Sequence, residues 1–383
     1  MTKNLFSILI IVLSFLSCNT DSKTEAEKLD QQKNENINLL ANRYLELGRF
    51  SGVILVAKDD AVIYSNSFGY ADYENEIPFS DDTAFKIGDV SDLIISQMIQ
   101  QLVNDGKLVL SEKVSKYVSE LESDFTIDEV LFQNSENENF DYNNLIVLIE
   151  EVSEKSFKEN LDAFTKKLGL DNTYIERTNS NQAVGYLYHN YRGNGLELQK
   201  AAMLNPEDSS IKNMIISSAT DILKIINSDS SEKIEIDGYL KNDGFSYSVY
   251  KNPESNISTI VLSNRRHPVA KEISEGIKAI INDDTYQIPL ARKPYKNNKS
   301  LLPNYAGIYK LNENINLGVL HKNDSLFVMM GSNKIHLIPQ SDNQFYMEQT
   351  DASMRFVKDE NDIINEVILL NGFLDGKTIT RIK

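Results

Sequence analysis

Two aspartates three residues apart, Asp89 and Asp92, stand at the head of a strongly apolar segment. Residues 90–103 are apolar on nearly every side, which predicts a helix buried between other elements. A carboxylate pair on the first turn of such a helix could act on water or hold a metal ion. Aspartate is also a preferred helix N-cap, and an acid three residues later resembles a capping box near the positive end of the helix dipole. Because no third ligand is identifiable, we favour capping over catalysis or metal binding.

Other candidate nucleophiles are weaker. Ser91 lies on the first turn of the same predicted helix, but two positions along a helix is about 200° of rotation, so it should face away from a site at Asp89. The pattern Ser-x-x-Lys occurs at residues 209–212 and 230–233, in polar stretches where it is expected by chance. The histidines have no neighbouring acid or serine pattern and are interpreted as surface or packing residues; they are His189, His267, His321 and His336. No metal or cofactor is expected.

The single cysteine, Cys18, follows a segment typical of a targeting signal. Lys3 precedes an apolar run over residues 5–16, which is too short to span a bilayer but has the length of a signal-peptide core. Ser17 followed by the only cysteine resembles the lipobox of bacterial lipoproteins, in which the thiol is acylated and becomes the new N-terminus. We expect residues 1–17 to be a lipoprotein signal peptide and Cys18 the lipid attachment point; the alternative is a free cysteine in a secretory signal.

The overall charge excludes one class of partner. The 383 residues include 56 Asp and Glu against 39 Lys and Arg, a net charge of −17. Nucleic-acid binding is not expected, because it depends on basic residues that neutralise phosphates. The composition, 41% hydrophobic and 25% charged, is that of a globular protein long enough for two domains. Attachment to a membrane is expected through the lipid alone, since anionic lipid would repel the folded part.

The elements that must position these residues begin after a polar stretch. Residues 18–36 lack regularly spaced apolar residues that could form the buried face of a helix or strand. They are predicted to be a flexible tether. A helix over residues 37–47 ends at Gly48, and residues 51–57 and 62–65 alternate as a β-hairpin. Strands, then helices, then strands again indicate an α+β domain. The remaining predicted helices are 145–152, 157–168, 219–226 and 270–281, with a strand at 258–262.

A second domain is predicted at the C-terminus. The α+β domain is assigned residues 37–285, and residues 286–303, rich in proline and lysine, are expected to be a linker. From residue 304 to 383, short apolar runs recur about every ten residues with Asn, Asp and Gly between them. Such spacing predicts a small antiparallel barrel or sandwich.

Three strings near the start of the folded part carry a family resemblance. They are residues 50–58 (FSGVILVAK), 68–72 (FGYAD) and 83–88 (TAFKIG), the last directly before the buried helix. They resemble the opening of the serine β-lactamase and penicillin-binding-protein superfamily, in its class C and D-alanyl-D-alanine carboxypeptidase-like branch. The resemblance implies an antiparallel sheet with a helical subdomain, and it covers roughly residues 37–284. The C-terminal strands resemble the small β domain often appended to such proteins.

The resemblance also implies a catalytic serine and lysine, which this chain lacks. In the family, the serine of Ser-x-x-Lys at the head of the buried helix attacks a carbonyl, and the lysine one turn on helps to deprotonate it. Asp89 and Asp92 occupy these two positions. A carboxylate does not form the usual acyl-enzyme, and the second acid adds negative charge where the mechanism needs a base that is neutral or positive.

Two further family motifs are compared by the same resemblance. Tyr142 and Asn144 match the Tyr-x-Asn pair that lines the family's cleft, so they are candidate retained cleft residues; ordinary capping and packing is the equal alternative. The third motif, Lys-Thr-Gly or His-x-Gly, should fall near residues 237–245. There the trailing Gly244-Phe245 is present and the His-x-Gly ahead of it is absent.

Two functions remain open from the sequence. We favour a catalytically degenerate lipoprotein of the bacterial cell envelope, on the periplasmic face or cell surface, that binds, scaffolds or regulates. Its candidate ligands are a cell-wall peptide, a small molecule or a protein. The alternative is an active esterase, peptidase or β-lactamase-like hydrolase. It would use Ser91 with Tyr142 or the pair Asp89 and Asp92.

Overall fold

The computed structural model describes most of the chain from residue 20 onward. The described residues are 20–119, 125–132, 143–175, 181–189, 197–201, 214–228, 233–240, 242–265, 269–289, 295–330, 333–347, 352–370, 374 and 376–382. In this part of the chain no helix is both long and apolar enough to cross a membrane.

A five-stranded antiparallel sheet forms the centre of the first domain, in the order β10-β11-β12-β1-β2. Its central strands are buried on both faces, as expected for a sheet covered by helices on each side. The predicted hairpin is confirmed, and Asp59 and Asp60 form its turn with φ of 49° and 63°. The strands are β1 (Gly52–Lys58), β2 (Ala61–Phe68), β10 (Ile234–Leu240), β11 (Phe245–Asn252) and β12 (Ile257–Ser263).

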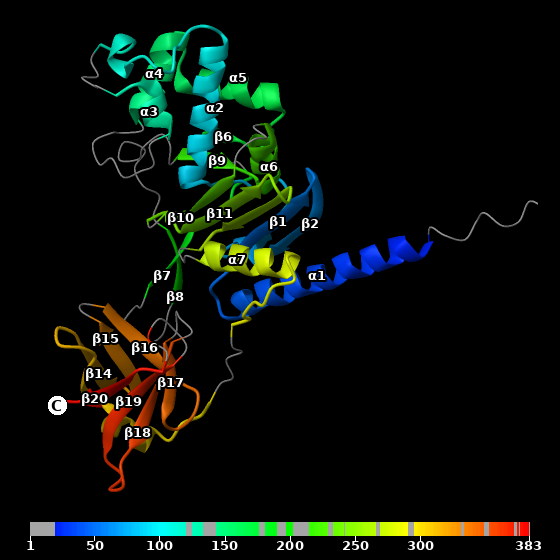
Figure 1. Ribbon diagram of the computed structural model, residues 1–383. Helices are drawn as coiled ribbons and strands as arrows, with labels where there is room; N and C mark the ends of the chain where they lie inside the picture. The colour runs from blue at the N-terminus through cyan, green and yellow to red at the C-terminus, as the bar shows by residue number, and fades with distance from the viewer. Residues whose placement is uncertain are drawn as a thin grey trace, which may run out of the picture.

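Helices cover both faces of this sheet (Figure 1). On one face α1 (Thr20–Glu46) and α7 (Val269–Ile281) pack together, and Gly276 gives Leu40 the space for close approach. The other face carries the helical subdomain around α2 (Ser91–Asn104). Its other helices are α3 (Ile127–Phe132), α4 (Asn143–Ser153), α5 (Phe157–Leu168) and α6 (Ala219–Ser228). The predicted α+β architecture is therefore confirmed.

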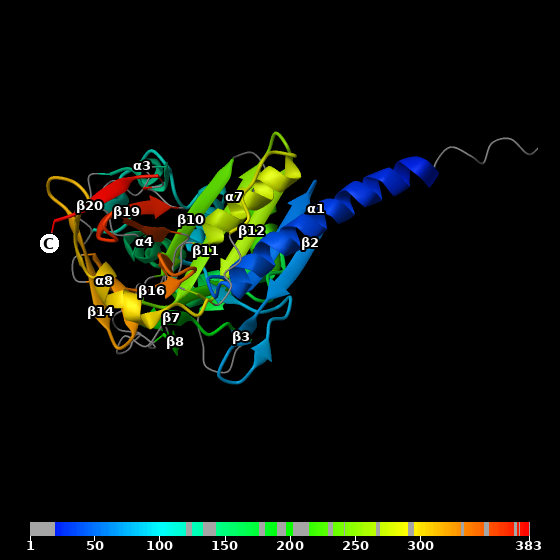
Figure 2. The ribbon, with the colours of Figure 1, turned by 90° about the horizontal axis from the view of Figure 1, so that it is seen from below.

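The structure corrects the expected tether. Residues 20–36 belong to α1, so the helix begins at Thr20 rather than near residue 37. The segment contains three Glu, three Lys and two Gln, which favour helix even without an apolar face. Its second half is held by packing, and Lys33 Nζ binds Ile281 O at 2.6 Å and Asp283 Oδ2 at 3.0 Å. The N-terminal end of α1 projects beyond the sheet (Figure 2).

The predicted buried helix is confirmed in its extent and burial. A 3-10 turn, η1 (Gly88–Val90), leads directly into α2. Its apolar side chains are buried, and the helix ends before Gly106, which has φ of +71°. The turn follows β5 (Phe85–Lys86), the edge of a small sheet with β9 (Ile215–Ser217) and β6 (Tyr174–Ile175).

Short elements complete the first domain. A two-stranded ribbon, β3 (Tyr70–Asp72) and β4 (Ile77–Pro78), follows the hairpin, and η2 (Val114–Lys116) follows α2. A second ribbon is formed by β7 (Tyr186–His189) and β8 (Glu197–Lys200). His189 therefore ends a strand, whereas His267 lies outside the described residues.

The C-terminal domain is a closed eight-stranded barrel, which decides between the predicted barrel and sandwich. The expected linker is shorter than 286–303, because η5 (Lys299–Leu301) and α8 (Leu302–Tyr305) pack against the barrel core. His321 and His336 lie on barrel strands. The strands are β13 (Gly307–Lys310), β14 (Asn316–Lys322), β15 (Ser325–Met330), β16 (Asn333–Pro339), β17 (Gln344–Met347), β18 (Ser353–Lys358), β19 (Ile364–Leu370) and β20 (Thr378–Arg381).

Candidate functional site

Asp89 lies in η1, between β5 and the buried helix α2, with its side chain exposed. The preceding Gly88 has φ of +50°, a conformation that residues with a side chain rarely adopt. A Cβ on Gly88 would also lie 2.5 Å from Tyr247 Oη. The turn that presents Asp89 therefore requires glycine on both grounds.

Tyr247 fills the space next to Asp89. It lies on β11 directly opposite Gly238 of β10, and a Cβ on Gly238 would be 2.3 Å from the phenol oxygen. The side chain of Tyr247 is 2% exposed. Two glycines on separate elements thus leave the volume that this one ring occupies.

The phenol group of Tyr247 binds both the backbone and the side chain of Asp89. Asp89 N donates to Tyr247 Oη at 3.0 Å, and Tyr247 Oη donates to Asp89 Oδ2 at 2.8 Å. Burial, with the negative charges of Asp89 and Asp92, raises the pKa of Tyr247 above its ordinary value. The phenol is therefore a proton donor at neutral pH, which matches its bond to the carboxylate.

This geometry corrects the predicted helix cap. The N-cap of α2 is Val90, and no side chain accepts a hydrogen bond in that position. Asp89 does not act as the cap because Gly88–Val90 already form a helical turn, whereas a capping residue is normally extended. Asp92 lies on the first turn of α2, half-buried, and its charge acts on Tyr247. Both acids therefore act on a tyrosine that no sequence motif identified, Asp89 through hydrogen bonds and Asp92 through its charge.

The alternative nucleophile, Ser91, lies on the first turn of α2. Ser91 is 0% exposed, and its hydroxyl donates to Gly88 O at 2.5 Å. Tyr142 lies outside the described residues. Asn144 lies half-buried in the first turn of α4, which packs against α2. The side chain and the backbone amide of Asp89 are both bonded to Tyr247.

The segment at the expected third motif forms the end of β10 and the turn into β11. Gly244 has φ of +79°, and a Cβ there would meet Tyr186 N at 2.3 Å, so this glycine is structurally required. Phe245 is buried against the ring of Phe85. Gly244-Phe245 therefore serves close backbone packing beneath η1.

An ion pair that the sequence analysis missed lies between β5 and the turn that connects β10 with β11. Lys86 Nζ and Asp243 Oδ1 are 2.6 Å apart, with side chains 13% and 10% exposed. The two residues are 157 positions apart, so no local spacing could reveal them. The pair joins β5, and hence η1, to the turn between β10 and β11.

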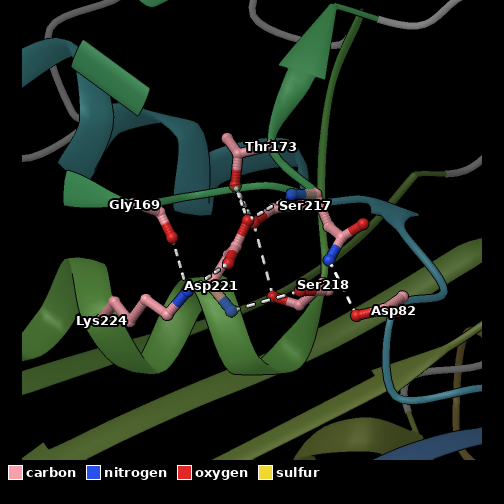
Figure 3. Close-up of polar contacts among 8 residues, drawn as sticks. Asp82, Gly169, Thr173, Ser217, Ser218, Asp221 and Lys224 are labelled. Carbon is pink, nitrogen blue, oxygen red and sulfur yellow. Dashed lines mark hydrogen bonds and ion pairs between the residues drawn. The ribbon is translucent and has the colours of Figure 1, made fainter. Parts of the chain in front are cut away.

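A buried polar cluster holds the start of α6 (Figure 3). Asp221, 1% exposed, accepts hydrogen bonds from Asn172 N at 2.7 Å and Thr173 Oγ1 at 3.0 Å, and pairs with Lys224 Nζ at 3.2 Å. Ser218 Oγ accepts from Asp221 N. Because β9 leads into α6 and pairs with β5, this cluster supports the strand that precedes Asp89. Its role is positional.

No set of three His, Cys, Asp or Glu side chains within the described ranges is arranged to hold a metal ion.

In a comparison with known protein families, residues 36–136 match the Beta-lactamase family model. The putative penicillin-binding protein PbpX of Bacillus subtilis is 31% identical over 115 residues, which is 28% of this chain and 29% of that protein. A teichoic acid D-alanine hydrolase of Staphylococcus aureus is 30% identical over 77 residues, which is 20% of this chain and 19% of that protein. The chain thus matches less than a third of the length of these relatives.

Solved structures extend the likeness to the whole fold. The octameric penicillin-binding protein homologue from Pyrococcus abyssi superposes with a TM-score of 0.52 at 17% identity, over 93% of this chain and 100% of that chain. The D-alanine carboxypeptidase AmpC from Burkholderia cenocepacia gives 0.51 at 15% identity, over 67% of this chain and 99% of that chain. The sequence match at residues 36–136 and the shared fold support the resemblance to the β-lactamase and penicillin-binding-protein superfamily.

Proposed function

We propose that this protein is a catalytically degenerate member of the superfamily, which binds a cell-envelope ligand without hydrolysing it by acyl transfer. The observation that carries the proposal is the Tyr247 hydroxyl bound to the amide and carboxylate of Asp89. It lies where the family resemblance would require a serine open to substrate.

The first step of the argument concerns the nucleophile. Acyl transfer needs a hydroxyl or thiol activated by a neighbouring base. Asp89 and Asp92 supply two carboxylates instead, and both act on the same phenol. Ser91 is fully buried and donates to Gly88 O, so it offers no replacement.

The second step concerns space and hydrogen-bond donors. A tetrahedral intermediate is stabilised by preorganised donors, often backbone N–H groups, aimed at its oxyanion. The N–H of Asp89 is already bonded to Tyr247 Oη at 3.0 Å. A substrate carbonyl could reach the N–H of residue 89 only after the Tyr247 ring moved away. That ring is 2% exposed and therefore held by its surroundings.

The proposal is tested by incubating the protein with a fluorescent penicillin and with a fluorophosphonate, followed by intact-mass analysis. We expect no covalent adduct and no turnover of a chromogenic ester above that of the heat-denatured protein. An adduct mapped to residue 89 or 91 would contradict the proposal. So would ester turnover that Asp89→Asn or Ser91→Ala abolishes, since it would assign the active alternative.

The ligand class follows from the relatives. Their names refer to penicillin binding and to the D-alanine of teichoic acid, both of which concern the bacterial envelope. We infer that a ligand of this protein comes from the same setting, as a cell-wall peptide, a small molecule or a protein partner, and that its role is binding or regulation.

We also propose that a lipid on Cys18 anchors the protein in the envelope. The proposal rests on the signal-like residues 1–17, which lie outside the described residues. The described helix α1 begins two residues after Cys18 and spans about 40 Å at 1.5 Å per residue, so it would act as a helical spacer. We expect Cys18→Ala to move the protein from the membrane fraction to the soluble fraction, and Ser17→Ala to leave it membrane-bound. An equal distribution of both variants would contradict the anchor.

A further inference from the structure

A pocket lies beside the Lys86–Asp243 ion pair. Its volume is about 70 Å³, and we call it the Lys86 pocket. Its apolar lining residues are Ala183, Val184, Ala201, Ile216 and Phe245. Lys86, Asp243 and Lys200 supply its charged groups. The lining residues do not include Asp89 or Tyr247, so the pocket is distinct from the site argued above.

Small residues and close backbone packing create this space. A Cβ on Gly185 would lie 1.7 Å from Asp243 O, so the backbone at residue 185 packs directly on the turn that carries Asp243. Ala201 N donates to Gly185 O at 2.8 Å, which closes the second ribbon beside the pocket. Ala183 and Ala201 then leave a gap that larger side chains would fill. The pocket is therefore a consequence of backbone geometry, and its walls are held in place.

The charge of the Lys86 pocket is opposite to that of the whole protein. Lys86 and Asp243 compensate each other at 2.6 Å. Lys200 adds a further positive charge, and its pairing with Glu74 is loose, at 3.9 Å with side chains 39% and 59% exposed. An exposed pair of this kind contributes little and is easily exchanged for another anion. The described lining residues thus carry one excess positive charge, in a chain of net charge −17.

We propose that the Lys86 pocket binds a small carboxylate, either a free amino acid or the C-terminal residue of a peptide. The ligand carboxylate would replace Glu74 as the partner of Lys200. The ligand's carbon chain, one or two atoms long, would lie against Ala183, Ala201 and Ile216. Apolar walls strengthen such a charge interaction because they exclude water. An amino group could reach the Asp243 carboxylate. A volume of about 70 Å³ is on the scale of acetate, glycine or alanine.

The wall of the pocket supplies its own probes, because Ala183, Ala201 and Ile216 carry methyl groups. With the methyls of Ala and Ile labelled for NMR, titration with acetate, D-alanine or L-alanine should shift these three signals saturably. Acetamide, an uncharged isostere of acetate, should leave them unchanged. Ile379 of the barrel core serves as the remote reference within the same protein. Comparing free alanine with alanyl-alanine distinguishes the two sources of the carboxylate.

Matched variants separate charge from space. We expect Lys200→Ala to weaken acetate binding at least tenfold and Ala201→Leu to abolish it by filling the pocket. Lys166→Ala, which removes an exposed lysine of α5, should leave binding unchanged. Unshifted signals elsewhere show that each variant is folded.

The proposal is overturned if acetamide shifts the three methyl signals as acetate does, if Lys166→Ala weakens binding as much as Lys200→Ala, or if Ala201→Leu binds normally. It is likewise overturned if acetate shifts Ile379 as strongly as Ala201. These outcomes are independent of the covalent-labelling test, because neither Asp89 nor Tyr247 takes part in them.

Discussion

Substituting Asp89→Ser and Asp92→Lys together will leave the protein unlabelled by a fluorescent penicillin, and adding Tyr247→Ala will produce labelling at position 89. The double substitution restores the residue types that the family resemblance implies at these two positions. The space and the backbone N–H at position 89 nevertheless remain occupied by the phenol of Tyr247. Removing the ring opens both, and we expect labelling at least tenfold above that of the double variant.

Controls for this prediction come from the same strands. Tyr239→Ala, added to the double substitution in place of Tyr247→Ala, removes a 51% exposed tyrosine of β10 and should leave the protein unlabelled. Ser91→Ala should not reduce labelling of the triple variant, since Ser91 is fully buried.

Stability must be followed in parallel, because losing a buried aromatic side chain costs about 3–5 kcal/mol. Circular dichroism will show whether the triple variant is folded, and Tyr247→Leu retains more of the packing volume if it is not. Labelling of the double variant at the level of the triple would show that Tyr247 is no barrier. A folded triple variant without labelling would also contradict the prediction.

Substituting Asp221→Ala will lower the free energy of unfolding by about 3–5 kcal/mol, the cost of leaving a buried charge and its donors without their partner. The substitution removes the acceptor of Asn172 N and Thr173 Oγ1 and the counter-ion of Lys224. For a domain of this size, that corresponds to a fall in Tm of roughly 6 to 20 °C. Calorimetry of the first domain's transition would measure it.

Asp82→Ala provides the matched control for Asp221. Asp82 is exposed and accepts one hydrogen bond, from Asn172 Nδ2 at 3.0 Å, at the edge of the same cluster. Its loss should change the free energy of unfolding by no more than about 0.5 kcal/mol. If the two alanine variants were equally stable, the cluster in Figure 3 would not hold the start of α6.

Elements in which apolar residues recur at a regular spacing could be predicted from the sequence. The apolar run of α2, the hairpin of β1 and β2, and seven of the barrel strands carry repeating patterns that a short window contains. β20 was not predicted, because four residues near the chain end are recognised only by pairing with β13. β10 and β11 were also not predicted, although residues 234–237 alternate between isoleucine and an acid.

Other differences arise from competition between local tendencies. Residues 20–36 lack an apolar stripe, yet their composition favours helix, and packing of the following turns against α7 holds the same helix in place. Asp89 has the residue type of a cap, but the 3-10 turn at Gly88–Val90 removes the extended conformation that capping needs. In both cases the neighbouring structure decides between two locally acceptable states.

The sequence by itself determined the fold class, the two-domain order, the superfamily resemblance and the identity of the acids at residues 89 and 92. Only the tertiary structure decided what surrounds those acids. Tyr247 is 158 residues away from Asp89, and it reaches that residue because the register of β10 and β11 sets it opposite Gly238. Lys86 and Asp243, 157 positions apart, likewise meet only in the folded protein, where β5 lies next to the turn between β10 and β11. Contacts of this kind depend on register and on the absence of two Cβ atoms, at Gly88 and Gly238, and no local pattern in the chain contains that information.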